Sequence, residues 1–224
     1  AINFFLEPFH DWLVEENIQS MTLVGHSLGG YLCGRYAAQN SSIIDKLVLA
    51  SPVGIPLIPP DRLRGSQLPT SLRLIDTLWH ANVTPQQLIR AVGATRGQRN
   101  VRRALRGRIP SLKTGEEELL ADYLYHITVA HPSGEFAMNS LLEPGISPDI
   151  MGVFAREPLF DVEIDVERVK ILFGDHDWMR TNQPSAEEFA HRLRRRGGRA
   201  SINVLPSAGH HLYFDNPDLF CNHI

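Results

Sequence analysis

Short apolar runs alternate with amphipathic stretches at both ends of the chain. Four runs have the length and composition of buried parallel strands. They lie at residues 21–25, 45–50, 169–174 and 200–205. Apolar residues at helical spacing predict helices at residues 3–17, 28–39, 185–196 and from Pro217 onward. The pattern therefore predicts strand–helix–strand units of the α/β class.

The middle of the chain has a different pattern. Between residues 55 and 165, prolines separate short amphipathic helical patterns, and no period-2 strand pattern stands out. We predict that 55–165 is a helical lid or cap, inserted into a core formed by residues 1–54 and 166–224.

Composition excludes several classes of protein. The 224 residues are 43% hydrophobic and 21% charged, which is typical of a globular protein rather than a disordered or collagenous one. Two cysteines cannot form a disulfide framework or a four-ligand zinc site. No apolar run approaches the roughly 18 residues that cross a bilayer. The first residue is Ala1, and no leader pattern follows it.

The segment Gly25-His-Ser27-Leu28-Gly29 matches G-x-S-x-G between a predicted strand and a predicted helix. Such a turn holds the serine in a strained conformation, and Gly25 and Gly29 provide the small neighbours that it needs. Ser27 is therefore the candidate nucleophile. The Leu28 amide, at the helix start, is the candidate oxyanion donor.

A serine nucleophile needs a base and a carboxylate that orients the base. Asp175 and Asp177 follow the strand that ends at Gly174, and His210 follows the last strand. The order Ser27, Asp177, His210 is that of α/β-hydrolases. Asp175 remains the competitor for the acid. His26 is expected to serve packing or to support the oxyanion loop.

Four segments carry a resemblance to the α/β-hydrolase superfamily. They are LVGHSLGGYL (23–32), HPSGE (131–135), FGDHDWM (173–179) and AGHHLYFDNP (208–217). The chain most resembles the branch of lipid acyl hydrolases and acyltransferases that includes cardiolipin deacylases and lyso-N-acylphosphatidylethanolamine lipases. This resemblance implies a mainly parallel sheet with helices on both faces and a helical lid. It also implies a lipid substrate and a mitochondrial or membrane-peripheral, intracellular location.

The resemblance assigns Ser27 as nucleophile, His210 as base and Asp177 as acid, by the G-x-x-D spacing after the strand. His210 and Asp215 also match the H-x4-D pattern that this branch shares with glycerolipid acyltransferases. There the aspartate would orient the histidine as base on an acyl acceptor, with acyl-CoA as co-substrate. Alternatively, Asp215 caps the last helix.

Basic residues are concentrated in the predicted lid. Between Arg90 and Lys113 there are eight Lys or Arg and no acid. The candidate contacts for an anionic lipid headgroup or membrane surface are Arg99, Arg102, Arg103 and Arg106. A solvated lid face without a ligand is the alternative. The segment lacks the interleaved aromatics of nucleic-acid sites, and the histidine spacing predicts no metal.

Three functions remain open. The first is hydrolysis of a membrane phospholipid ester, such as cardiolipin or a lysophospholipid, without a cofactor. The second is acyl transfer from acyl-CoA to a lysophospholipid, such as lysophosphatidic acid. The third is a lipid-binding coactivator, against which Ser27 argues. Because no HG-x-G-type loop precedes Ser27, we expect the chain to be the C-terminal half of the sheet with a complete lid. Such a fragment is expected to be nearly inactive and poorly soluble.

Overall fold

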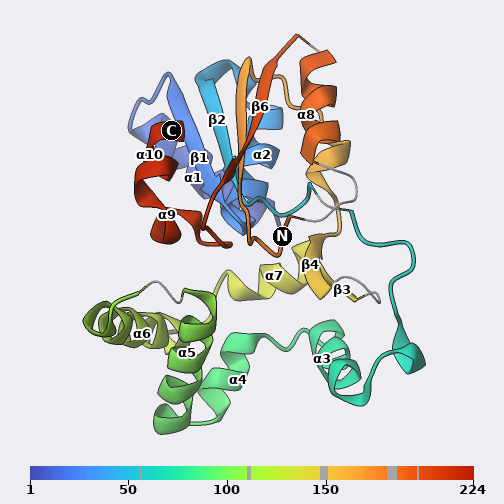
Figure 1. Ribbon diagram of the computed structural model, residues 1–224, viewed down its shortest axis with the longest axis vertical. Helices are drawn as coiled ribbons and strands as arrows, with labels where there is room; N and C mark the ends of the chain where they lie inside the picture. The colour runs from blue at the N-terminus through green and yellow to red at the C-terminus, as the bar shows by residue number, and fades with distance from the viewer. Residues whose placement is uncertain (56, 110–111, 147–150, 181–185, 196) are drawn as a thin grey trace. The chain divides into compact units, whose positions relative to one another are not determined.

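The computed structural model describes residues 1–55, 57–109, 112–146, 151–180, 186–195 and 197–224. Its described helices are α1 (Asn3–Glu15), α2 (Leu28–Gln39), α3 (Thr70–His80), α4 (Pro85–Ala91), α5 (Ala94–Arg108), α6 (Thr114–Val129), α7 (Glu135–Leu141), α8 (Ala186–Arg195), α9 (Leu212–Asp215) and α10 (Pro217–His223). Its described strands are β1 (Met21–His26), β2 (Ile44–Ala50), β3 (Leu142–Ile146), β4 (Met151–Ala155), β5 (Arg168–Gly174) and β6 (Arg199–Leu205). The chain divides into two compact units (Figure 1), Ala1–Leu63 with Leu141–Ile224, and Arg64–Ser140.

The first unit contains a parallel sheet in the order β1-β2-β5-β6. The register pairs His26 with Ala50, Ala50 with Leu172, and Gly174 with Leu205. These strands begin and end within one residue of the predicted runs, because strands covered on both faces are apolar almost throughout. Their carboxyl ends therefore lie along one edge of the sheet, where the candidate site residues follow them.

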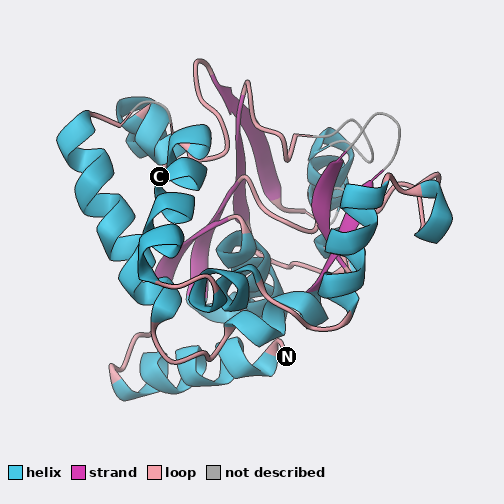
Figure 2. Cartoon of the chain, turned by 90° about the horizontal axis from the view of Figure 1, so that it is seen from below, coloured by secondary structure: helices cyan, strands magenta, loops and turns pink. Residues whose placement is uncertain are grey.

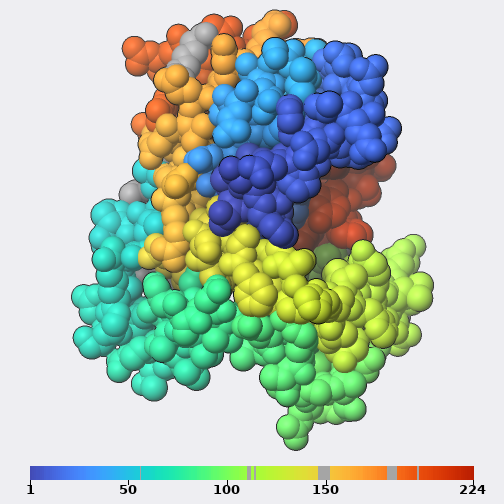
Figure 3. Space-filling view, turned by 180° about the vertical axis from the view of Figure 1, so that it is seen from behind, coloured from blue at the N-terminus to red at the C-terminus, as the bar shows by residue number. Residues whose placement is uncertain are grey.

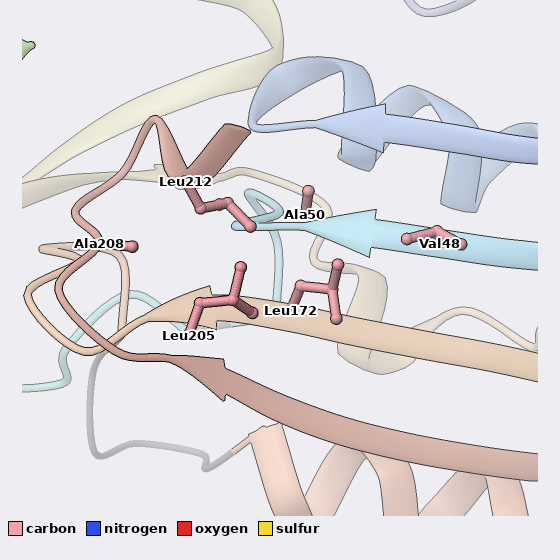
Figure 4. Packing of buried hydrophobic residues seen from close by; sticks show 6 residues of the cluster. All are labelled: Val48, Ala50, Leu172, Leu205, Ala208 and Leu212. Carbon is pink, nitrogen blue, oxygen red and sulfur yellow. The ribbon is translucent and has the colours of Figure 1, made fainter. Parts of the chain in front are cut away.

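Helices cover both faces of this sheet (Figures 1 and 2). On one face, α9 and α10 pack against a cluster of fully buried side chains (Figure 4). Its members are Val48, Ala50, Leu172, Leu205, Ala208 and Leu212. Alternating residues such as Leu47, Leu49 and Ile171 are also fully buried and point to the other face, where α2 and α8 contact the strands. This confirms the predicted α/β class with helices on both faces.

The first helix, α1, tolerates a proline in its interior. Pro8 lies inside α1, which ends two residues before the predicted end at residue 17. The helix packs on α2 through Phe9, whose ring centroid lies 5.0 Å from that of Tyr36, and His10 Nδ1 lies 2.9 Å from the Tyr36 hydroxyl. Figure 3 shows α1, in dark blue, on the surface of this unit. Tertiary packing thus offsets the cost of the proline.

Two strands, β3 and β4, lie within the segment 55–165 that the sequence pattern predicted to be a helical lid. β3 and β4 pair antiparallel, from Leu142 opposite Ala155 to Ile146 opposite Met151, and belong to the same unit as the main sheet. The sequence of β3 does not show the apolar–polar alternation of a strand, because a buried position is occupied by an acid, Glu143. This acid forms ion pairs with Arg62 and Arg156.

The second unit, Arg64–Ser140, is helical and narrower than the predicted segment 55–165. Helices α5 and α6 pack together through an apolar cluster. It contains Leu105, Ile109 and Ala121, with Leu112, Leu120 and Leu124 against it. Polar contacts join α7 to α4, since Glu135 accepts from the Thr84 hydroxyl at 2.8 Å and from Arg90 Nη1 at 3.0 Å. The glutamate of HPSGE thus has a structural partner within its own unit.

Candidate functional site

Ser27 occupies the sharp turn between β1 and α2. Its backbone has φ 55° and ψ −119°, a strained conformation for a residue with a side chain. The Ser27 amide donates to the Ala50 carbonyl at 3.0 Å, and its carbonyl accepts from the amides of Tyr31 and Val53 at 3.1 and 3.2 Å. The turn is thus anchored to β2 and to α2, and it holds Ser27 at the carboxyl edge of the sheet.

Two glycines are sterically required around this turn, and one of them differs from the prediction. A Cβ on Gly25 would lie 2.5 Å from the Gly29 carbonyl oxygen and 2.6 Å from Cys33 Sγ. A Cβ on Gly30 would lie 3.0 Å from Pro52 Cβ, whereas one on Gly29 would meet nothing within 4 Å. The requirement for a missing side chain therefore falls on Gly25 and Gly30, and not on Gly29.

The structure brings the three predicted triad residues together. His210 Nε2 lies 3.0 Å from Ser27 Oγ, and His210 Nδ1 lies 3.0 Å from Asp177 Oδ1. The Asp177 side chain is fully buried and that of His210 is 10% exposed. An ionised Asp177 can only accept, so Nδ1 carries the proton and Nε2 is left to accept from the serine hydroxyl. This is the tautomer that a general base requires.

The environment of Asp177 keeps it ionised. Burial alone would raise its pKa, but the hydrogen bond with His210 and the 2.9 Å hydrogen bond from the Met179 amide act against burial. The net effect is that the pKa of Asp177 is lowered. A carboxylate that is charged, buried and bonded to the ring is suited to stabilise an imidazolium.

Asp175, the competing acid, binds the main chain instead. Its carboxylate accepts from the amides of Ser207 and Ala208 at 2.9 and 3.0 Å, and these two hydrogen bonds hold the pKa of Asp175 below its usual value. Both amides belong to the loop that leads from β6 to His210. The geometry therefore favours Asp177 as the triad acid, while Asp175 holds the loop between β6 and His210 in place.

Asp215 also contacts the main chain of this loop. Its Oδ2 accepts from the Gly209 amide at 2.9 Å, one residue before His210. The N-cap of α10 is Asn216, whose side chain accepts from the Leu219 amide, and Asp215 directly precedes this cap. Asp215 lies at the end of α9. The acyltransferase role of the His210–Asp215 pattern stays a prediction.

The Leu28 amide has the position that the sequence predicted. Helix α2 begins at Leu28, directly after Ser27, and the amides of a first helical turn have no intrahelical partner. The positive end of the α2 dipole lies at the same place. An oxyanion forming over Ser27 would find this donor, although its catalytic role stays a prediction.

Two arginines of the predicted anion-binding segment have acidic partners within the helical unit. Arg106 Nε donates to both carboxylate oxygens of Glu117, at 2.8 and 2.9 Å, and Arg90 binds Glu135. No acid lies within the basic segment of the sequence, but acids on other helices of the same unit form ion pairs with two of its arginines. Arg99 and Arg103 are exposed on α5, and Arg102 is partly exposed. Among the described residues, no group of three or more His, Cys, Asp or Glu could hold a metal ion.

The chain belongs to the alpha/beta hydrolase family, whose model matches residues 4–223. It is 30% identical to a probable 1-acylglycerol-3-phosphate O-acyltransferase of Oryza sativa subsp. japonica, over 97% of this chain and 52% of that protein. It is 27% identical to a (lyso)-N-acylphosphatidylethanolamine lipase of Bos taurus, over 96% of this chain and 60% of that protein. The chain therefore spans about half the length of the first of these relatives and three fifths of the second.

Solved structures support the same fold. An esterase from Exiguobacterium antarcticum superposes with a TM-score of 0.61 at 16% identity, covering 100% of this chain and 72% of the esterase. A likeness at this identity shows the fold alone. The resemblance inferred from the four sequence segments is confirmed at the level of the family, and the relatives include both a lipase and an acyltransferase by name.

Proposed function

We propose that this chain carries the catalytic centre of a serine-dependent acyl ester hydrolase that acts on membrane phospholipids, with cardiolipin or a lysophospholipid as substrate. The observation that carries the proposal is the continuous hydrogen-bonded series from Ser27 Oγ through His210 to buried Asp177. Similarity to a (lyso)-N-acylphosphatidylethanolamine lipase supports a lipid ester rather than a peptide as substrate.

The proposed reaction has two steps. His210 Nε2 takes the hydroxyl proton as Ser27 Oγ bonds to the ester carbonyl carbon, and the Leu28 amide donates to the oxyanion. The tetrahedral intermediate collapses when His210 gives the proton to the leaving alcohol oxygen of the phospholipid and the carbon–oxygen ester bond breaks. Water then attacks the acyl-enzyme carbonyl carbon as His210 takes one of its protons. His210 gives this proton to Ser27 Oγ as the serine–acyl bond breaks, which releases the fatty acid and regenerates Ser27. Asp177 stays ionised throughout.

The proposal is tested by comparing the full-length protein with its Ser27→Ala variant on a phospholipid panel that includes cardiolipin and lysophospholipids. Ser42→Ala is the matched control, because Ser42 is exposed and follows α2 on the surface. We expect fatty-acid release from at least one phospholipid to fall to background in Ser27→Ala and to stay unchanged in Ser42→Ala. Equal release by Ser27→Ala and the wild type would overturn the proposal.

A second candidate function is acyl transfer from acyl-CoA to a lysophospholipid such as lysophosphatidic acid. It is favoured by the 30% identity to a relative described as a probable 1-acylglycerol-3-phosphate O-acyltransferase. Labelled acyl-CoA supplied with and without the lyso-acceptor separates the two reactions, since transfer yields diacyl product and hydrolysis yields free fatty acid. In a lipid-binding coactivator, the third function, a fluorophosphonate probe would leave Ser27 unlabelled.

We also propose a peripheral contact with an anionic membrane, mitochondrial or elsewhere inside the cell, through Arg99, Arg102 and Arg103. No helix in the described part of the chain is long and apolar enough to span a bilayer. Each basic residue near an anionic surface contributes about 1 kcal/mol. Replacing all three by Gln should therefore lower the affinity for phosphatidylserine or cardiolipin vesicles, measured by co-sedimentation, by about a hundredfold. Unchanged sedimentation would exclude this surface.

A further inference from the structure

The histidine that precedes the candidate nucleophile contacts the candidate base through the main chain. His26 is the last residue of β1, and its Nε2 lies 2.8 Å from the carbonyl oxygen of His210. A carbonyl oxygen only accepts, so the hydrogen lies on Nε2 and His26 is the donor. This contact joins residues that are 184 positions apart in the sequence, one at the end of β1 and the other in the loop after β6.

His26 is enclosed by other rings of the same unit. Its ring centroid lies 4.7 Å from that of His210, 5.3 Å from that of His211 and 5.0 Å from that of Tyr213. Burial lowers the pKa of His26 to about 4, and the neighbouring His210 and His211 act in the same direction. His26 is therefore neutral near pH 7 and donates without placing a second positive charge beside the base.

The contact completes the anchoring of the His210 loop. On one side, Asp175 holds the amides of Ser207 and Ala208. On the other, Asp215 holds the amide of Gly209. These three bonds fix the chain up to the residue before the base. The His26 bond fixes the base's own carbonyl, and it does so from the residue that precedes Ser27.

We propose that His26 is a positioning residue, whose Nε2–H holds the His210 main chain so that the imidazole stays aligned between Ser27 and Asp177. This inference deepens the proposed function and rests on it. Because His26 and Ser27 are consecutive in the chain, any movement of the nucleophile turn is passed to the base through this hydrogen bond. The nucleophile and the base then move together rather than apart.

The test compares His26→Leu, which removes the donor, with His26→Gln, whose side-chain amide can donate from a similar reach. His191→Leu is the matched control, because His191 is exposed on the surface of α8. The first readout is the rate at which a fluorophosphonate probe labels Ser27 in the full-length protein, and the second is kcat and KM for ester hydrolysis. Misplacement of a catalytic group by about 1 Å costs on the order of a hundredfold.

We expect His26→Leu to lower the labelling rate and kcat together by ten- to a hundredfold, with KM within about twofold, and His26→Gln to recover most of both. A His26→Leu variant that labels at the wild-type rate, or equal losses in His26→Leu and His26→Gln, would overturn the inference. Because labelling needs no lipid, it separates the two proposals. Labelling that depends on His26 without phospholipid hydrolysis would refute the substrate and retain the positioning role, whereas an unlabelled wild-type Ser27 would refute both.

Discussion

Gly174 is the position where one added methyl group should do the most damage to the candidate site. It is the last residue of β5, and a Cβ built there would lie 2.1 Å from the Ala208 carbonyl oxygen and 2.4 Å from that of Gly209. Both are backbone atoms of the loop that carries His210. Since heavy atoms in contact need more than 3 Å, Gly174→Ala must displace this loop by about 1 Å.

The expected loss can be worked from that displacement. His210 Nε2 is 3.0 Å from Ser27 Oγ, so a further 1 Å takes the pair beyond the range of a hydrogen bond. A shift of this size costs about a hundredfold in kcat, or about 2.7 kcal/mol in the activation free energy. Overpacking should also lower the free energy of unfolding by about 1–3 kcal/mol.

The assay is ester hydrolysis by the full-length protein together with its unfolding in urea, with Gly107→Ala as control. Gly107 lies in α5, where an added Cβ meets nothing within 4 Å. Gly107→Ala should keep full activity and gain up to about 1 kcal/mol of stability from helix propensity. If Gly174→Ala kept wild-type kcat while remaining folded, the idea that the loop's main chain positions the base would be refuted.

Three other predictions follow from the charged and nucleophilic groups. Asp177→Asn should lower kcat by up to about 10⁴-fold with little change in stability or KM, because the Asn amide can donate to His210 Nδ1 and so favour the tautomer with its proton on Nε2. Steady-state kinetics checks this, and an unchanged kcat would point to another acid. The pKa of Glu135 is lowered, chiefly by its hydrogen bond with Arg90. Its contribution to stability is therefore present above its ordinary pKa of 4.5 and lost as the pH falls through the pKa of the folded state. Urea unfolding midpoints measured from pH 7 to 3 should show this loss, and Glu135→Gln should be less stable at pH 7 and have a smaller pH dependence of the midpoint. Burial raises the pKa of the Cys33 thiol to about 11, so iodoacetamide at pH 8 should alkylate exposed Cys221 first, as mass spectrometry of the folded protein would show.

Local patterns in the sequence were sufficient for the main sheet and the candidate triad. The four parallel strands are short apolar runs, and the segments after β1, β5 and β6 carry Ser27, Asp177 and His210, so these three residues could be placed at one sheet edge by topology alone. The hairpin β3–β4 could not be predicted in this way. Its buried acid, Glu143, is compensated by arginines 13 and about 80 positions away, and such pairing leaves no periodic pattern.

The different roles of Asp175 and Asp177 depend on contacts that their spacing in the sequence does not determine. Asp175 and Asp177 are two residues apart after the same strand, and either could reach a histidine. Gly174 resolves the choice, because its missing side chain lets the loop main chain come so close to β5 that the amides of Ser207 and Ala208 reach Asp175. Asp177 is then left to meet the imidazole, and of the hydrogen bonds that lower the pKa of Asp177 the one with His210 has the largest effect. The G-x-x-D spacing therefore works through the glycine as much as through the acid.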